Sequence, residues 1–268
     1  MGIREIFNIY RGNLSQLSAF LAVLINPSNT ININTIKIDD KYPFPANRST
    51  FDGIREDFIK FTKYAVIRRI IEDVDILLLN LYKFVLCISL IHLSKNEERR
   101  FLRLSFNERL EKIDSILKGK LKSYKELWQS IHDVRNDLVH NNSIVKQDII
   151  NLQIPKVYSY IVIDGEKRWI PYFDDGTVSG FDISKITEYH MGVENYTKTF
   201  HKGEEIIFSN NDMKFLLSGL DWSIYQIDRI ISQFIIDNGF YNLEGDKYIL
   251  NIQKLKQFEE FINKNNNN

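Results

Sequence analysis

The segment that decides the fold is Ile131-His132-Asp133-Val134-Arg135-Asn136-Asp137-Leu138-Val139-His140-Asn141-Asn142. It follows an amphipathic run at 123–129 and ends in two asparagines, which are typical of a helix C-terminus. The pattern predicts that Arg135, Asn136 and His140 occupy the last turns of one helix. On an ideal helix, Arg135 and His140 are separated by about 140°. They can meet on one small ligand only if the helix loosens after Arg135, or if a second copy of the motif completes the site.

These residue types suit the cleavage of a phosphodiester without a metal ion. An imidazole has an unperturbed pKa of about 6.5, so it exchanges protons near neutral pH. A guanidinium keeps its charge and its donors fit phosphate oxygens, and an asparagine can hold either group in place. RNA is the natural substrate for this chemistry, because its 2′-hydroxyl is a built-in nucleophile. His132, Asn136 and His140 also share nearly one helix face, since steps of four residues stay aligned.

The pattern Arg-Asn-x-x-x-His, late in a helix that follows a long apolar helix, resembles the signature of the HEPN superfamily. The matching residues are Arg135, Asn136 and His140, and supporting similarity covers roughly residues 55 to 145, including 106–113 and 126–128. Many members of this superfamily are metal-independent ribonucleases in which the motif helices of two protomers form one composite cleft. The resemblance therefore implies an endoribonuclease that works as a homodimer through its motif helices.

The resemblance also implies a role for each residue. A 2′-hydroxyl would attack the adjacent phosphate and leave a 2′,3′-cyclic phosphate, with His140 as general acid or base, Arg135 stabilising the phosphorane and Asn136 orienting them. The candidates for binding the RNA substrate are Arg68, Arg69 and His132. Neither a metal nor a cofactor is implied. Such enzymes commonly serve as toxins or effectors in defence against phage or stress.

Plain structural roles are the alternative. Arg135 and His140 are both favoured near the negative pole of a helix end, His132 suits a solvated or core position, and Arg68 and Arg69 suit a solvated face. A second function hypothesis is a catalytically inactive or partner-gated HEPN-like module, which docks a regulatory protein or a nucleic-acid sensor. The 35 basic and 35 acidic residues give a net charge of zero, which favours this hypothesis because no global field attracts RNA.

Composition and hydropathy predict a cytoplasmic protein without a membrane contact. The single cysteine, Cys87, excludes an intrachain disulfide, and the N-terminal residues lack the pattern of a signal peptide. The apolar run 76–93 is near the lower length limit for a membrane span. Lys83 lies near its middle, where a charge is costly in lipid. We therefore expect a buried helix there, with a membrane span as the lesser alternative.

The predicted fold is mainly α: a HEPN-like bundle of four to five helices, with a small β-rich insertion after the motif helix. We expect an N-terminal helical segment and arm at 1–50, the helical domain at 51–264 with its insertion at about 155–208, and a disordered tail at 265–268. Helices are predicted at 3–25, 52–93, 106–118, 123–141, 210–237 and 251–263. The apolar face predicted for the first half of the second helix consists of Ile54, Phe58, Phe61, Ala65 and Ile70. Strands are predicted at 157–163, 168–173 and 204–208, a hairpin around 244–246, and a charged connection at 95–103.

Overall fold

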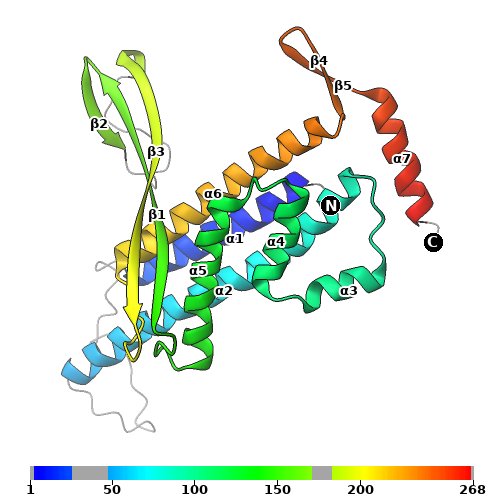
Figure 1. Ribbon diagram of the computed structural model, residues 1–268. Helices are drawn as coiled ribbons and strands as arrows, with labels where there is room; N and C mark the ends of the chain where they lie inside the picture. The colour runs from blue at the N-terminus through cyan, green and yellow to red at the C-terminus, as the bar shows by residue number, and fades with distance from the viewer. Residues whose placement is uncertain (1–2, 26–47, 171–182, 267–268) are drawn as a thin grey trace, which may run out of the picture. The chain divides into compact units, whose positions relative to one another are not determined.

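The computed structural model describes residues 3–25, 48–170 and 183–266 (Figure 1). Over these ranges the protein is mixed α/β and mostly helical. The helices are α1 (Ile3–Ile25), α2 (Arg48–Ile88), α3 (Lys95–Arg103), α4 (Phe106–Ile116), α5 (Lys122–His140), α6 (Asn210–Asp237) and α7 (Ile252–Asn266). The strands are β1 (Ile149–Ile163), β2 (Glu166–Ile170), β3 (Ile186–His201), β4 (Tyr241–Glu244) and β5 (Lys247–Leu250), and a 3₁₀ turn, η3, covers Ile183–Lys185.

Contacts divide the chain into two compact units. The first contains the chain up to Arg11, residues 72–132 and the chain from Asp221 onward, and the second contains 12–71 and 133–220. The helices α1, α2, α5 and α6 contribute residues to both units.

The core of the first unit contains the apolar second half of α2 and buried residues of α6. Val74, Leu78 and Leu81 of α2 are completely buried, as are Ile224 and Ile227 of α6. The predicted apolar run at 76–93 is helical up to Ile88, where α2 ends; most of its apolar residues up to that point are buried, but Ile76 is 58% exposed. Over the described ranges, no helix is long and apolar enough to cross a membrane.

The predicted connection at 95–103 is wrong, because these residues form the helix α3. Ser94 and Glu97 make a capping box at its start: the Ser94 hydroxyl accepts from the Glu97 amide, and the Glu97 carboxylate accepts from the Ser94 amide. Phe101 is buried and stacks on Tyr82 of α2, with ring centroids 4.1 Å apart. This highly charged helix is held by its cap, by the stacking of Phe101 on Tyr82 and by an ion pair of 2.6 Å between Glu98 and Lys83 of α2, none of which the charge pattern alone reveals.

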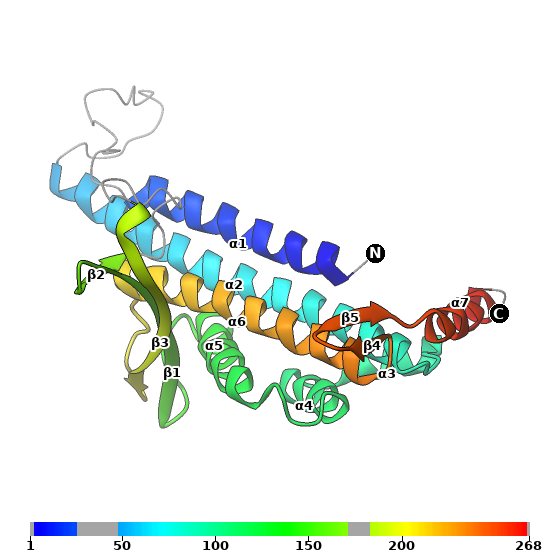
Figure 2. The same ribbon diagram turned by 90° about the horizontal axis from the view of Figure 1, so that it is seen from above.

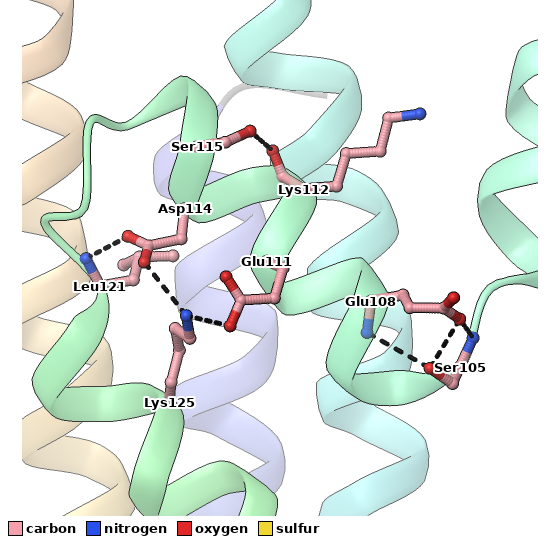
Figure 3. A network of polar contacts seen from close by, with 8 residues as sticks. All are labelled: Ser105, Glu108, Glu111, Lys112, Asp114, Ser115, Leu121 and Lys125. Carbon is pink, nitrogen blue, oxygen red and sulfur yellow. Dashed lines mark hydrogen bonds and ion pairs between the residues drawn. The ribbon is translucent and has the colours of Figure 1, made fainter.

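A polar network fixes the turn between α4 and α5 (Figure 3). Asp114 is buried, and its carboxylate accepts from the Leu121 amide at 2.7 Å. Lys125, one turn into α5, donates to both Asp114 and Glu111. Gly119 has a φ of 78°, which places the predicted helix break in the left-handed conformation that glycine favours. This network sets where the motif helix begins.

We expect Asp114→Ala to lower the free energy of unfolding by about 2 kcal/mol, because it leaves a helix-start amide without its acceptor and removes one partner of Lys125. Urea denaturation measures the change. The matched control is Glu111→Ala, which removes an exposed partner of the same lysine and should cost about 0.5 kcal/mol or less. Equal losses from the two variants would contradict the role given to Asp114.

The second unit contains a three-stranded antiparallel sheet with the order β2-β1-β3 (Figures 1 and 2). β1 pairs with β3 from Ile149↔His201 to Ile163↔Ile186. The predicted turn at Asp164-Gly165 is confirmed: both residues have positive φ, 52° and 79°, as a type I′ hairpin turn requires. A β-rich segment does follow the motif helix, as predicted.

Three details of the second unit differ from prediction. β3 was not predicted, because its sequence is polar and lacks an apolar run. No strand forms at 204–208, where the isolated bridge Ile144↔Glu205 is found instead. The apolar face predicted for α2 is wrong at Phe58 and Phe61, which are 54% and 64% exposed, whereas Thr62, Lys63, Val66 and Ile67 are buried instead. Its last residue, Ile70, is buried as predicted.

The remaining helices and the C-terminal hairpin form close to their predicted positions. α7 extends to Asn266, two residues into the segment expected to be a tail. Most of the predicted arm, 26–47, and the end of the predicted strand at 168–173 lie outside the described residues.

Candidate functional site

The helix α5 places the motif residues on its last turns. Leu127, Trp128, Ile131 and Val134 are buried at helical spacing and hold one side of α5 in the core. Arg135 and Asn136 are half-buried, and His140 is exposed at the last residue of the helix. The three predicted catalytic residues therefore lie outside the apolar stripe. Because His140 is exposed, a ligand can reach it.

Arg135 and Asn136 are in direct contact. The Arg135 Nη1 donates to the Asn136 Oδ1 at 3.1 Å. The Arg135 Nε is buried, and among the described residues nothing accepts a hydrogen bond from it. A buried donor without an acceptor costs stability.

The helix does not loosen between Arg135 and His140, because α5 stays helical through His140. Their directions are therefore separated by about 140°, as an ideal helix requires. The first of the two ways in which these side chains could meet on one ligand, a loosened helix, is therefore not seen in α5.

Asp137, inside the motif, has a structural role. It is buried, and its carboxylate accepts from the Asn141 side chain and from the Lys146 amide. Its carbonyl accepts from the Asn141 and Ser143 amides. Asp137 thus closes the C-terminus of α5, close to His140 in the chain.

The segment after α5 is held by the first half of α2. Ser143 and Glu205 are joined by a hydrogen bond of 3.2 Å, and Glu205 forms an ion pair with Lys60. The hydrogen bond from Lys60 lowers the pKa of Glu205. Tyr64 and Lys63 donate to the carbonyls of Ile206 and Phe208 at 2.6 and 2.8 Å. We call the residues Lys60, Lys63, Tyr64, Ser143 and Glu205 the α5 clamp. Glu205 joins Ser143, which follows the motif helix, to Lys60, and Lys63 and Tyr64 hold the neighbouring carbonyls of Phe208 and Ile206.

A second polar cluster surrounds Asp212 at the start of α6. Its carboxylate accepts from Tyr196, Lys198 and the Ser209 amide, and the Ser209 hydroxyl accepts from the Asp212 amide. Burial favours a raised pKa for Asp212, but the hydrogen bonds from Lys198 and Tyr196 outweigh burial and lower the pKa. The spacing Ser-x-x-Asp is a capping-box signal that the sequence offers, whereas the partners on β3 could not be predicted without the strand.

We expect Asp212→Asn to lower the free energy of unfolding at neutral pH by about 2–3 kcal/mol, because Lys198 loses its charged partner. The folded pKa of Asp212 lies below its ordinary value of 3.8, so this stabilisation is complete above that value and is lost as the pH falls through the folded pKa. Urea denaturation at neutral and at acidic pH should therefore show the difference between wild type and variant shrinking in acid. An equal difference at both pH values would contradict the assignment. The control is Asp148→Asn, whose exposed pair with Lys202 should contribute little.

The structure places the predicted substrate-binding residues as follows. Arg68 and Arg69 are exposed on α2. His132 is half-buried and stacks on Phe106, with ring centroids 4.5 Å apart and planes inclined by 10°. The ring of His132 therefore has a packing contact, whichever further role it has. Over the described ranges, no cluster of acidic, histidine or cysteine residues could hold a metal ion.

Comparison with protein-family models, with curated proteins and with solved structures finds no match to this chain.

Proposed function

We propose that the protein is a HEPN-type, metal-independent endoribonuclease whose site is completed by two copies of α5. The observation that supports it most is the arrangement of the motif on one unbroken helix. Arg135 is half-buried and its Nη1 donates to Asn136, and His140 is exposed at the helix end. These are the donors and the proton carrier that cleavage of RNA needs.

The dimer that we propose is the one that the resemblance implies, and helix geometry is compatible with it. Arg135 and His140 of one copy diverge by about 140°. In a two-fold dimer the same patch on both copies forms the interface, so Arg135 of one copy can lie opposite His140 of the other. A scissile phosphate between them would meet both groups.

The proposed reaction is an in-line attack within the RNA. The 2′-oxygen bonds to the adjacent phosphorus, its proton goes to a base, and the bond from phosphorus to the 5′-oxygen breaks. His140 takes up or supplies a proton, and Arg135 stabilises the negative charge on the phosphoryl oxygens. The products are a 2′,3′-cyclic phosphate and a 5′-hydroxyl. Arg68, Arg69 and His132 are proposed to bind flanking nucleotides, with the two arginines on phosphates.

The biological role that we propose is a toxin or effector in defence against phage or stress. It rests on the resemblance of Arg135, Asn136 and His140 to the superfamily motif.

RNA cleavage by the purified protein in excess EDTA tests this proposal. We expect cleavage to continue in EDTA and to leave 2′,3′-cyclic phosphate ends. A phosphatase should remove the phosphate from these ends only after a treatment that opens the cyclic phosphate. Cleavage that EDTA abolishes, or that leaves 5′-phosphate ends, would contradict the mechanism.

A second candidate is a partner-gated or inactive HEPN-like module. The exposure of the large apolar residues Phe58 and Phe61 on α2, together with the net charge of zero, favours a protein that docks a partner. The two candidates are separated by the activity of the isolated protein: robust cleavage without any partner would exclude this second one.

A further inference from the structure

The positive charge of this net-neutral chain is concentrated in one segment, residues 95–125. This segment contains ten basic and five acidic residues, which leaves 25 basic and 30 acidic residues for the rest of the chain. It covers α3, α4 and the start of α5, and it lies entirely within the first unit. The net charge of zero is thus an average of a basic segment and an acidic remainder, so a local site for a polyanion is compatible with it.

The acidic residues of this segment are all bound inside the protein. They are Glu97, Glu98, Glu108, Glu111 and Asp114. Two of them complete the capping boxes at the starts of α3 and α4, one pairs with Lys83 of α2, and the last two accept from Lys125 (Figure 3). Their negative charges are therefore engaged by groups of the protein itself.

The outer face of α3 is built from basic residues. Lys95, Arg99 and Arg103 recur every four residues, so they lie on nearly one side of the helix. Phe101 is two residues from each arginine, which turns it about 200° away from both, and it is buried against Tyr82. This packing directs the three basic side chains to the solvent, and all three are exposed. We call Lys95, Arg99 and Arg103 the α3 basic face.

The charges of the α3 basic face are not neutralised within the part of the chain that the structure describes. There, none of Lys95, Arg99 and Arg103 forms a hydrogen bond or an ion pair. Successive members are about 6 Å apart along the helix axis, four residues at 1.5 Å each. An extended single strand of nucleic acid spaces its phosphates similarly, and proteins bind such strands with basic side chains that follow the backbone.

We propose that the α3 basic face binds the phosphate backbone of single-stranded RNA. This inference rests on the proposed ribonuclease function, because it assigns part of the substrate's backbone to α3. A guanidinium presents its donors in a rigid fork that fits phosphate oxygens. Phosphate contacts carry no sequence information, so the α3 basic face adds affinity without selecting a sequence.

The apolar residues of α3 favour a nucleic acid over a lipid surface as the ligand. A helix that lies on a membrane needs a large apolar face beside its basic one. Of the two apolar residues of α3, Phe101 is buried in the protein and only Leu102 is exposed. A single leucine gives too little apolar area to hold the helix in lipid, whereas phosphates in water need only the charges.

Binding of a labelled single-stranded DNA tests the α3 basic face separately from cleavage. A strand of about 12 nucleotides has a common site size, and it lacks the 2′-hydroxyl, so the proposed reaction cannot cut it. Fluorescence anisotropy at several salt concentrations compares the wild type with Arg99→Gln/Arg103→Gln, in which glutamine keeps a similar helix propensity. The matched control is Lys185→Gln/Lys202→Gln, which removes two exposed charges from the second unit. Thermal unfolding checks that both variants are folded.

We expect the arginine variant to bind more weakly and with less dependence on salt. Each phosphate contact of a single strand contributes about −0.7 to the slope of log K against log salt, so two lost contacts should flatten the slope by about 1.4 and weaken binding on the order of 20-fold near 0.1 M salt. The loss should be the same for oligo-dA and oligo-dT. The control should stay within about twofold of the wild type, because exposed charges that do not contact the strand are largely screened.

The proposal is overturned if the wild type does not bind the strand, or if the arginine variant keeps the affinity and salt slope of the wild type. Equal losses in the arginine variant and the control also overturn it, because they report net charge alone. Vesicles of phosphatidylserine and phosphatidylcholine test the lipid alternative: arginine-dependent binding to vesicles without binding to DNA would likewise overturn the proposal.

The two proposals fail in different ways. DNA binding that needs Arg99 and Arg103, in a protein that cuts no RNA, would support the α3 basic face and count against the ribonuclease. RNA cleavage by a protein whose DNA binding is independent of these arginines would overturn the α3 basic face and leave the ribonuclease in place.

Discussion

Protein carrying Arg135→Ala or His140→Ala is expected to cut RNA about 10²–10⁴-fold more slowly than the wild type. Loss of the imidazole removes proton transfer, and loss of the guanidinium removes the charge that stabilises the phosphorane. His140 is exposed, so its removal leaves the core intact. Removal of Arg135 also ends its bond to Asn136, so the effect of Arg135→Ala includes some loss of positioning. Initial rates on a labelled RNA, in EDTA, measure both variants.

The matched control for these variants is Val139→Ala, an exposed residue on the same last turn of α5. Its cleavage rate should stay within about twofold of the wild type, since it contacts no reacting group and changes stability little. If His140→Ala cut RNA as fast as Val139→Ala, the role given to the histidine would be wrong.

Trp128→Ala is expected to cause the largest loss of stability. Trp128 is 1% exposed in the first unit, and its Nε1 donates to the Ser223 hydroxyl of α6 at 3.3 Å. Truncating a buried tryptophan costs about 3–5 kcal/mol through lost burial and the cavity left behind. A domain is typically stable by about 5–15 kcal/mol, so the variant should unfold roughly 10 °C lower.

Thermal and urea unfolding measure the effect of Trp128→Ala, and Trp222→Ala is its control. Trp222 is only half-buried, with its ring centroid 5.8 Å from that of Tyr225, so its truncation should cost less than half as much. If the two variants lost equal stability, the apolar stripe of α5 would not be the main anchor of the motif helix.

Sequence patterning predicted the elements whose signal is local. The late helix was predicted at 210–237 and is found at Asn210–Asp237, because its apolar residues recur at helical spacing. The turn at Asp164-Gly165 was predictable from two residue types that tolerate positive φ. The motif helix was predictable from Trp128, Ile131 and Val134 on one side and from the terminal asparagines.

The elements that were missed depend on contacts far apart in the chain. β3 is polar and becomes a strand through its pairing with β1. Lys63 occupies the buried side of α2 because it donates to the Phe208 carbonyl, 145 residues away. For the site, Arg135, Asn136 and His140 could be proposed from the sequence motif, whereas the α5 clamp and the buried Asp137 needed the fold.

Mixing Arg135→Ala protein with His140→Ala protein tests the composite site most directly. If each site takes Arg135 from one copy and His140 from the other, a mixed dimer keeps one intact site. Subunit exchange at equal amounts should then restore about a quarter of the wild-type rate, because half of the dimers are mixed and each has one of two sites. If exchange is complete by fluorescence energy transfer and the mixture stays as inactive as its components, a site shared between two copies is contradicted.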